Sequence, residues 1–288
     1  MGAVAMVAAV AVVPASTVAQ SPSAAPASAP ASVSPDDLLA KVRAAGVIRV
    51  STDPNYAPQS FVQPDGSYAG FDVDVANEIA RRLGVSVEFV TPDWDAIQSG
   101  GWGGRWDASV GSMTVTEARR AVLDFTEPYY YTPAQMAATA ASGVTALEGL
   151  AGRVVCVGSG TTYEFWLEGT LALGDGSATA PVPEGARVTT LPTDADCAQA
   201  VQSGRHDFDG WLSSSTTVAQ AIAAGAPFVE VGDPVFYEPL AVALDKAGPE
   251  HAGLLAALDA IVADMHADGT LTALSEKWYD GQDLTTKR

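Results

Sequence analysis

The sequence is poor in basic residues, and this shortage narrows the classes of partner that the protein can bind. It has 15 Lys and Arg against 34 Asp and Glu, which gives a formal net charge of −19 at pH 7. A protein that binds nucleic acid needs a basic surface to meet the phosphate backbone, so this composition excludes that function. The same charge favours solubility.

Residues that commonly bind metals are also scarce. The three histidines, His206, His251 and His266, are scattered and do not have the spacing of a ligand set. The two cysteines, Cys156 and Cys197, are too few for a four-cysteine zinc site, and neither belongs to a CxxC pair. We therefore expect no metal site and no cofactor.

Motifs of common enzyme classes are absent or incomplete. The sequence has no GxSxG, and Ser159 follows a predicted strand without the pattern of a nucleophile elbow. The segment GSGTTY, residues 158–163, resembles half of a dinucleotide-binding fingerprint but lacks its third glycine. Because no catalytic constellation is present, the sequence favours a binding protein over an enzyme.

The start of the chain predicts export. Residues 1–13 are an apolar run rich in Ala and Val that carries no charge and is too short to span a bilayer, and small residues follow it. This pattern predicts a signal peptide at residues 1–19, although the usual positive charge at its start is missing. The Ala/Pro/Ser-rich stretch that follows predicts a spacer at residues 20–40. No cysteine precedes Cys156, so we expect no lipid anchor.

The rest of the chain alternates predicted strands with predicted helices, which is typical of an α/β fold. About 250 residues remain after the spacer, enough for one large or two smaller domains. The strand candidates are residues 47–52, 85–90, 107–111, 153–158, 187–191, 208–212, 228–231 and 240–244.

The segment GFDVDVANEIARRL, Gly70–Leu83, predicts an amphipathic helix. We expect Asp72 to cap this helix and Gly84 to end it, with a half-buried strand at residues 85–90.

A second segment, SMTVTEARRAVLDFTEPYY, predicts a helix start that suits an anion. Thr114 and Glu117 have the spacing of a capping box, which places Arg119 in the first helical turn. Free amides, the positive end of the helix dipole and a guanidinium group together suit a carboxylate. A capped surface helix with a solvated arginine would show the same pattern, so this segment alone leaves both interpretations open.

These segments and four others resemble, in order and spacing, the family 3 extracellular solute-binding proteins, the amino-acid-binding proteins of ABC importers. The resemblance implies a periplasmic-binding-protein type II fold, in which two α/β lobes are joined by two crossover strands with the ligand cleft between them. It places lobe 1 at residues 41–132 and 238–288, and lobe 2 at residues 133–237. The matched segments are residues 47–61, 70–83, 93–97, 112–130, 154–164 and 261–280.

The resemblance implies a function as well as a fold. We expect a periplasmic or secreted monomer that captures a small amino acid or related carboxylate by hinge closure and delivers it to an ABC transporter permease.

The resemblance also implies a set of ligand-binding residues. Arg119 matches the family arginine that clamps the ligand carboxylate, and Trp94 matches an aromatic residue that lies against the ligand side chain. Each matched residue has a structural alternative, such as core packing for Trp94 or a turn cap for Asp53. The matched residues are Asp53, Tyr56, Trp94, Ser112, Thr114, Arg119 and Thr162, and Ser214 is the eighth member of the predicted ligand-binding set.

One position departs from the family pattern. In amino-acid binders of this family, a strand of lobe 2 usually ends in an acidic residue that pairs with the ligand ammonium. Here Ser214 takes that place, or Leu212 if no gap is allowed. A buried ammonium without a counter-charge is costly. Therefore either Asp53 or Asp209 supplies the charge, or the ligand is not a standard α-amino acid.

Three further features have open roles in the sequence. The glycine-rich segment after Trp94 predicts that the helix there stops early and presents Trp102 and Trp106 on a loop. Trp211 suits the pocket or the core equally well. In an exported protein Cys156 and Cys197 are expected to form a disulfide, with two buried thiols as the alternative.

Two other functions stay open. Cyclohexadienyl and arogenate dehydratases resemble these binders through the GFDVD region. However, catalysis needs a proton donor and acceptor, and the segment FDGWLSSS offers no obvious acid at the pocket end. A sensor domain of a signalling protein would need an appended transmembrane and cytoplasmic region, and the sequence stops at Arg288.

Overall fold

The computed structural model describes residues 1–3, 5, 6, 34 and 36–287. The predicted signal peptide and most of the predicted spacer therefore lie outside the described residues. The chain divides into two units, and all that follows concerns the second, residues 33–288. Among the described residues, no helix is long and apolar enough to cross a membrane.

Strands and helices alternate along this unit, which confirms the predicted α/β pattern. The helices are α1 (Leu38–Ala45), α2 (Phe71–Leu83), α3 (Trp94–Gln98), α4 (Glu117–Arg120), α5 (Thr162–Leu167), α6 (Asp194–Gln202), α7 (Ser215–Ala223), α8 (Ala252–Ala267) and α9 (Thr270–Trp278), with short 3-10 helices at Ala140–Ser142 and Leu147–Leu150. The strands are β1 (Val47–Ser51), β2 (Asn55–Tyr56), β3 (Ser60–Val62), β4 (Tyr68–Ala69), β5 (Ser86–Val90), β6 (Ala108–Thr114), β7 (Leu123–Thr139), β8 (Val154–Gly158), β9 (Arg187–Leu191), β10 (Gly210–Ser214), β11 (Phe228–Glu230) and β12 (Phe236–Asp245).

One mixed sheet runs through the whole unit because two of its strands are long. Its order is β5-β1-β6-β12-β7-β10-β8-β9, and β11 adds to β7. The antiparallel pair β7 and β12 continues from Asp245 opposite Leu123 to Phe236 opposite Ala134. At one end β12 pairs with β6, and at the other end β7 pairs with β10. These two strands are therefore the connection between two α/β halves.

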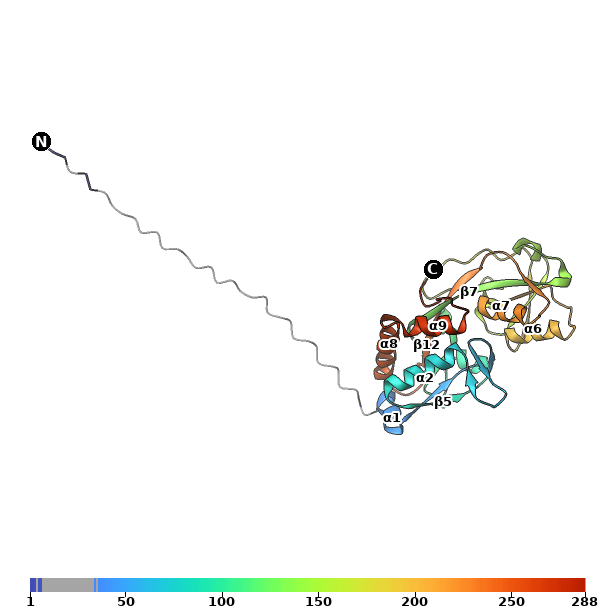
Figure 1. Cartoon of the computed structure of the whole chain (residues 1–288), viewed down its shortest axis with the longest axis horizontal. Helices are drawn as coiled ribbons and strands as arrows, with labels where there is room; N and C mark the ends of the chain where they lie inside the picture. The colour runs from blue at the N-terminus through green and yellow to red at the C-terminus, as the bar shows by residue number, and fades with distance from the viewer. Residues whose placement is uncertain (4, 7–33, 35, 288) are drawn as a thin grey trace. The chain divides into compact units, whose positions relative to one another are not determined.

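Each half has its own hydrophobic core. The first core gathers buried residues of α1, α2, α8, α9, β1 and β6, together with Trp102 and Trp106. The second core gathers residues of α5, α6, α7, β8 and β10. Figure 1 shows α1, α2, α8 and α9 together at one end of this unit and α6 and α7 at the other. The exact lobe boundaries stay a prediction.

The first helix begins inside the predicted spacer. The carboxylate of Asp37 accepts a hydrogen bond of 2.8 Å from the amide of Leu39 and caps α1. Buried Leu38, Leu39 and Val42 attach this helix to the first core. The folded part therefore starts before residue 41, the start that the sequence predicted.

The cap predicted for α2 was wrong, whereas its end was right. Gly70 precedes the helix with φ 129°, and a Cβ there would lie 2.2 Å from the carbonyl oxygen of Gln59. Only glycine fits this close approach. Asp72 instead points its buried carboxylate at β6 and β7. Gly84 ends the helix in the left-handed conformation, as expected, and Val87 and Phe89 are half-buried in β5.

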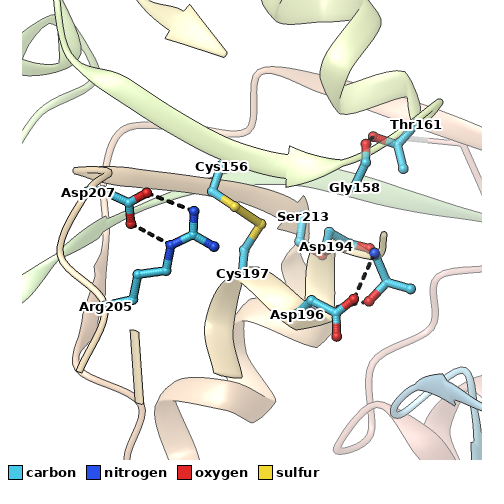
Figure 2. Close-up of a disulfide and its surroundings, with 10 residues drawn as sticks. Cys156, Gly158, Thr161, Asp194, Asp196, Cys197, Arg205, Asp207 and Ser213 are labelled. Atoms are coloured by element: carbon cyan, nitrogen blue, oxygen red, sulfur yellow. Dashed lines mark hydrogen bonds and ion pairs between the residues drawn. A yellow bond between two sulfur atoms is a disulfide. The ribbon is translucent and has the colours of Figure 1, made fainter. Parts of the chain in front are cut away.

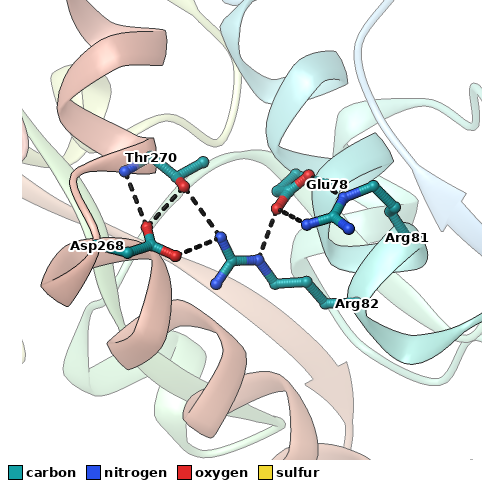
Figure 3. Close-up of polar contacts among 5 residues, drawn as sticks. All are labelled: Glu78, Arg81, Arg82, Asp268 and Thr270. Atoms are coloured by element: carbon teal, nitrogen blue, oxygen red, sulfur yellow. Dashed lines mark hydrogen bonds and ion pairs between the residues drawn. The ribbon is translucent and has the colours of Figure 1, made fainter.

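A polar network on the surface ties α2 to the turn between α8 and α9 (Figure 3). Arg82 donates to Glu78 at 2.6 Å within α2, and to Asp268 and Thr270 at 2.8 and 2.9 Å. Arg81 donates to Glu78, its one hydrogen-bond partner among the described residues. Of these two arginines, it is therefore Arg82 that joins segments far apart in the sequence.

The capping box predicted at Thr114 was also wrong. Strand β6 continues to Thr114, which pairs with Leu240 of β12, so the helix starts later. Thr116 is the cap of α4, and its hydroxyl accepts from the amide of Arg119 at 3.2 Å. Arg119 stays in this short helix, as predicted.

The glycine-rich segment behaves partly as predicted. Helix α3 ends early at Gln98, but Trp102 and Trp106 are buried in the first core and are not presented on the loop. The carboxylate of Asp245 explains this, because it accepts from the amides of Gly101 and Trp102 at 2.9 and 2.7 Å and folds the segment against β12. Trp211 is likewise a core residue, packed on Phe228.

A disulfide joins Cys156 of β8 to Cys197 of α6, with their Cα atoms 5.9 Å apart (Figure 2). This confirms the predicted bridge. The two cysteines lie in the second core, and the bridge attaches α6 to the central strands of that half. The disulfide therefore fixes the start of α6, including its first residue Asp194, to strand β8.

Candidate ligand-binding site

A pocket with a cavity volume of about 50 Å³ lies between the two cores. This volume is smaller than that of most small-molecule sites. The pocket brings together all seven residues that the family resemblance matched, but Ser214 does not line it. Its lining residues are Asp53, Tyr56, Trp94, Gly111, Ser112, Thr114, Arg119, Thr161, Thr162, Tyr163, Pro192, Thr193, Asp194 and Glu238.

Arg119 is the cationic side chain of this pocket, and it is only 3% exposed. Its Nη1 donates to the carbonyl of Thr114 at 3.0 Å, and its Nη2 donates to the carbonyl of Gly160 at 3.1 Å. Its Nε has no hydrogen-bond partner among the described residues. Burial lowers the pKa of Arg119 to about 10, although the charge of Glu238 opposes this. A buried guanidinium with an unused donor suits an anion.

Aromatic side chains close the pocket from both halves. Trp94 lies against the Arg119 guanidinium, whose central carbon is 5.1 Å from the ring centroid, and Trp94 Nε1 donates to the carbonyl of Gly160 at 3.2 Å. The hydroxyls of Tyr56 and Tyr163 are 3.3 Å apart and share a hydrogen bond. Trp94 and Tyr56 belong to the first half, whereas Gly160 and Tyr163, which they contact, belong to the second. The two halves are therefore in contact across the pocket.

Ser112 is held in an unusual conformation at the pocket wall. Its φ of 53° lies in the left-handed region, which is uncommon for residues other than glycine. Its hydroxyl donates to Asp72 at 2.6 Å, and its amide donates to the hydroxyl of Tyr129 at 3.1 Å. Burial raises the pKa of Asp72 to about 7, while hydrogen bonds from Ser112 and Tyr129 lower it. Asp72 does not line the pocket itself, but its hydrogen bond holds Ser112, which does.

Glu238 is a pocket acid that the sequence analysis missed. It is buried in β12, and its two oxygens accept hydrogen bonds from four hydroxyl groups, of Thr114 (2.7 Å), Thr162 (2.5 Å), Tyr163 (2.8 Å) and Thr132 (3.3 Å). The hydroxyls of Thr114 and Thr162, which the resemblance includes among the ligand-binding residues, thus face Glu238. One signal could have found it, since Glu238 is the only charged residue in the apolar run 235–244.

Asp194 and Asp53 are the other acids of the pocket. Asp194 is the first residue of α6, and its buried carboxylate accepts a hydrogen bond from the hydroxyl of Ser213. Burial and, to a smaller extent, the charges of Asp53 and Glu238 raise the pKa of Asp194 to about 7, although the hydrogen bond from Ser213 lowers it. Asp53 is partly buried and accepts from the amide of Asn55 at 2.7 Å, and desolvation raises its pKa too. The sequence had singled out Asp53 but not Asp194.

Two candidates for the missing acid position lie away from the pocket. Ser214 caps α7, and its hydroxyl also accepts from Gln59 Nε2 at 3.0 Å. Asp209 pairs with Arg153 at 2.9 Å and does not line the pocket. Asp209 is therefore not the counter-charge in this structure. No group of His, Cys, Asp and Glu within the described part of the chain has the arrangement of a metal site.

Comparison with known proteins agrees with the fold. The family model "Bacterial extracellular solute-binding proteins, family 3" matches residues 48–281. The L-cystine-binding protein TcyJ of Escherichia coli K12 is 30% identical over 257 residues, which cover 88% of this chain and 90% of that protein. The histidine-binding periplasmic protein of the same organism is 28% identical over 241 residues, 81% of this chain and 87% of its own.

Solved structures are similar as well. The P235GK mutant of the arginine-binding protein of T. maritima has a TM-score of 0.71 at 26% identity and covers 84% of this chain and 99% of its own. The ancestral amino-acid-binding protein AncCDT-1, described as a precursor of cyclohexadienyl dehydratase, has a TM-score of 0.69 at 31% identity, with 84% and 99% covered. These neighbours have the type II periplasmic-binding-protein fold, so the predicted fold class is confirmed, and the two halves are its lobes.

Proposed function

This chain belongs to the family 3 extracellular solute-binding proteins, and on that basis we propose that it captures a small amino acid or related carboxylate outside the cytoplasm. The ligand is held between the lobes and delivered to an ABC transporter permease, and the receptor acts as a monomer. Its relatives that bind cystine and histidine support this class of ligand.

The observation that carries the proposal is the state of Arg119. Its guanidinium is buried, lines the pocket and has an unused Nε donor among the described residues. A ligand carboxylate beside it would supply a counter-charge and a hydrogen-bond acceptor at once. Tyr56, Trp94, Ser112, Thr114 and Thr162, together with Asp53, complete the proposed binding site.

Closure of the lobes is the proposed mechanism. Strands β7 and β12 are the two connections between the lobes, so bending there opens the pocket. Contacts between the lobes, such as Arg119 Nη2 to the carbonyl of Gly160, exist only in the closed state. A ligand that touches both lobes binds the closed state better and shifts the population toward it.

The test is a thermal-shift screen of the standard L-amino acids, L-cystine and related carboxylates, followed by calorimetry of the compounds that raise the melting temperature. Arg119→Ala should then weaken binding by at least about 2 kcal/mol, the scale for a desolvated charged pair left half-made. Arg120→Ala is the matched control, because Arg120 is exposed on the same helix and does not line the pocket. Equal binding by both variants would exclude the proposed carboxylate site.

A second candidate function is a dehydratase of the same fold. The segment FDGWLSSS supplies no acid to the pocket, but Asp194 and Glu238 do so from other elements. A carboxyl with a pKa of about 7, such as that of Asp194, suits proton transfer near neutral pH. Incubation with prephenate or arogenate decides between the functions, since the binding protein leaves both unchanged.

A further inference from the structure

The charges in the pocket are not balanced. Three acidic side chains, Asp53, Asp194 and Glu238, line it together with a single cationic side chain, Arg119. None of the three acids forms an ion pair with any residue that the structure describes. Because buried charges are costly unless they are paired, the acids of the closed pocket lack a positive counter-charge.

The three acids differ in how much of their hydrogen-bonding capacity is used. Each oxygen of Glu238 already accepts from two hydroxyl groups. Asp194 accepts from one side chain, that of Ser213, and Asp53 accepts from one backbone amide. A carboxylate offers about four acceptor positions, so Asp194 and Asp53 have room for a further donor and Glu238 does not.

The position of Asp194 follows from strand β10. Neighbouring residues of a strand point to opposite faces, and the hydroxyls of Ser213 and Ser214 make different contacts. Ser214 bonds with α7 and Gln59, whereas Ser213 donates to Asp194, toward which it points in Figure 2. The end of β10 is where the resemblance places the acid of related binders. Here Ser213 at this strand end instead binds Asp194, an acid that comes from α6.

We propose that Asp194, together with Asp53 from the other lobe, binds the cationic group of the ligand while Arg119 binds its carboxylate. This inference rests on the proposed function and deepens it, because it assigns the counter-charge that Ser214 cannot supply. Asp53 follows β1 of lobe 1 and Asp194 starts α6 of lobe 2, so a cation between them links the lobes.

The electrostatics of the ligand-free pocket agree with this assignment. Burial raises the pKa of Asp194, and the negative charges of Asp53 and Glu238 raise it further. Desolvation, and to a smaller extent the charge of Asp194, raises the pKa of the hydroxyls of Tyr56 in β2 and Tyr163 in α5. A bound cation opposes the same repulsion and lowers the pKa of Asp194, so binding releases a proton below about pH 7. Affinity should therefore fall as the pH is lowered from 7.5 to 5.5.

The test compares wild type, Asp194→Asn and Asp209→Asn by calorimetry at pH 7.5 with the tightest of the standard L-amino acids and L-cystine. It also uses the analogue of that ligand without its α-ammonium. Asp209 is a matched control, since it is an aspartate near β10 that pairs with Arg153 outside the pocket.

We expect Asp194→Asn to lower the affinity for the amino acid by at least about tenfold, and Asp209→Asn to change this affinity less than about threefold. If the analogue without an ammonium binds Asp194→Asn as well as it binds wild type, the cation is the α-ammonium, and this binding also shows that the variant is folded. If Asp194→Asn weakens the binding of the analogue without an α-ammonium as much as that of the amino acid, the cation is on the side chain of the ligand. The pH dependence should disappear in Asp194→Asn.

Two results separate the inference from the proposed function. If wild type binds amino acids and Asp194→Asn binds them equally well, the inference is overturned and the function stands. The same holds if wild type binds the analogues without a cation as tightly as the amino acids. If no amino acid or related carboxylate binds wild type at all, the proposed function fails and the inference fails with it.

Discussion

Replacement of Asp194 by asparagine should stabilise the ligand-free protein while it weakens ligand binding. Asp194 is 5% exposed and its pKa is raised to about 7, against 3.8 for an accessible aspartate. Folding therefore takes up a proton between about pH 4 and pH 7. The free energy of unfolding falls as the pH rises through this window, and the full penalty applies above it.

The size of this penalty sets the expected effect. A difference of about 3 pKa units corresponds to about 4 kcal/mol, an upper limit because the pocket relaxes around the charge. Asparagine keeps an acceptor for Ser213 and cannot ionise. We therefore expect Asp194→Asn to raise the free energy of unfolding by roughly 1–3 kcal/mol at pH 8 and by much less at pH 5.

Urea unfolding of wild type and variant at both pH values measures this difference. Asp72 also has a pKa of about 7, but it is unchanged in both proteins and cancels in the comparison. Asp209→Asn should instead lose up to about 1 kcal/mol at either pH, since it breaks a partly exposed ion pair. If Asp194→Asn lowers the free energy of unfolding equally at pH 5 and pH 8, ionisation of Asp194 does not destabilise the folded protein and the reasoning is refuted.

Three other predictions follow from the contacts described above. Reduction of the Cys156–Cys197 bridge should raise the intact mass by about two daltons and lower stability by about 3–4 kcal/mol in the chain-entropy model, whereas free thiols in the unreduced protein would contradict the bridge. Glu238→Gln should cost about 1–3 kcal/mol in urea unfolding at pH 7, because an amide nitrogen cannot accept the hydroxyls that face it; an unchanged midpoint would speak against their role. Arg82→Ala should lower the melting temperature more than Arg81→Ala, because only Arg82 also pairs with Asp268, and the reverse order would show that the link between α2 and α8 does not stabilise the protein.

The parts that the sequence predicted are those that depend on local patterns. The periodic helix α2, its end at Gly84 and the half-buried strand after it follow from residue spacing alone. The local pattern also placed Arg119 in a short helix, although its cap is Thr116 and not Thr114, and its place at the pocket was implied by the family resemblance. Local patterns of this kind are complete within one segment, so no knowledge of the rest of the chain is needed.

The parts that the sequence did not predict depend on contacts between distant segments. Thr114 looks like a helix cap until β12 pairs with it and extends β6. Trp102 looks exposed until the carboxylate of Asp245 draws its loop into the core. Glu238 and Asp194 become pocket residues only because β12 crosses between the lobes and α6 points its first residue at the cleft. Apart from the single charge of Glu238 in an apolar run, these contacts have no signature in their own segments.

The most direct test of the account is a crystal structure of the protein with the tightest ligand found in the screen. The account predicts a closed form in which the ligand carboxylate lies about 2.7–2.9 Å from a guanidinium nitrogen of Arg119, the usual range for a charged N–H···O bond. It also predicts a cationic group of the ligand at a similar distance from Asp194. A ligand that binds outside this pocket, or inside it with its carboxylate away from Arg119, would contradict the account.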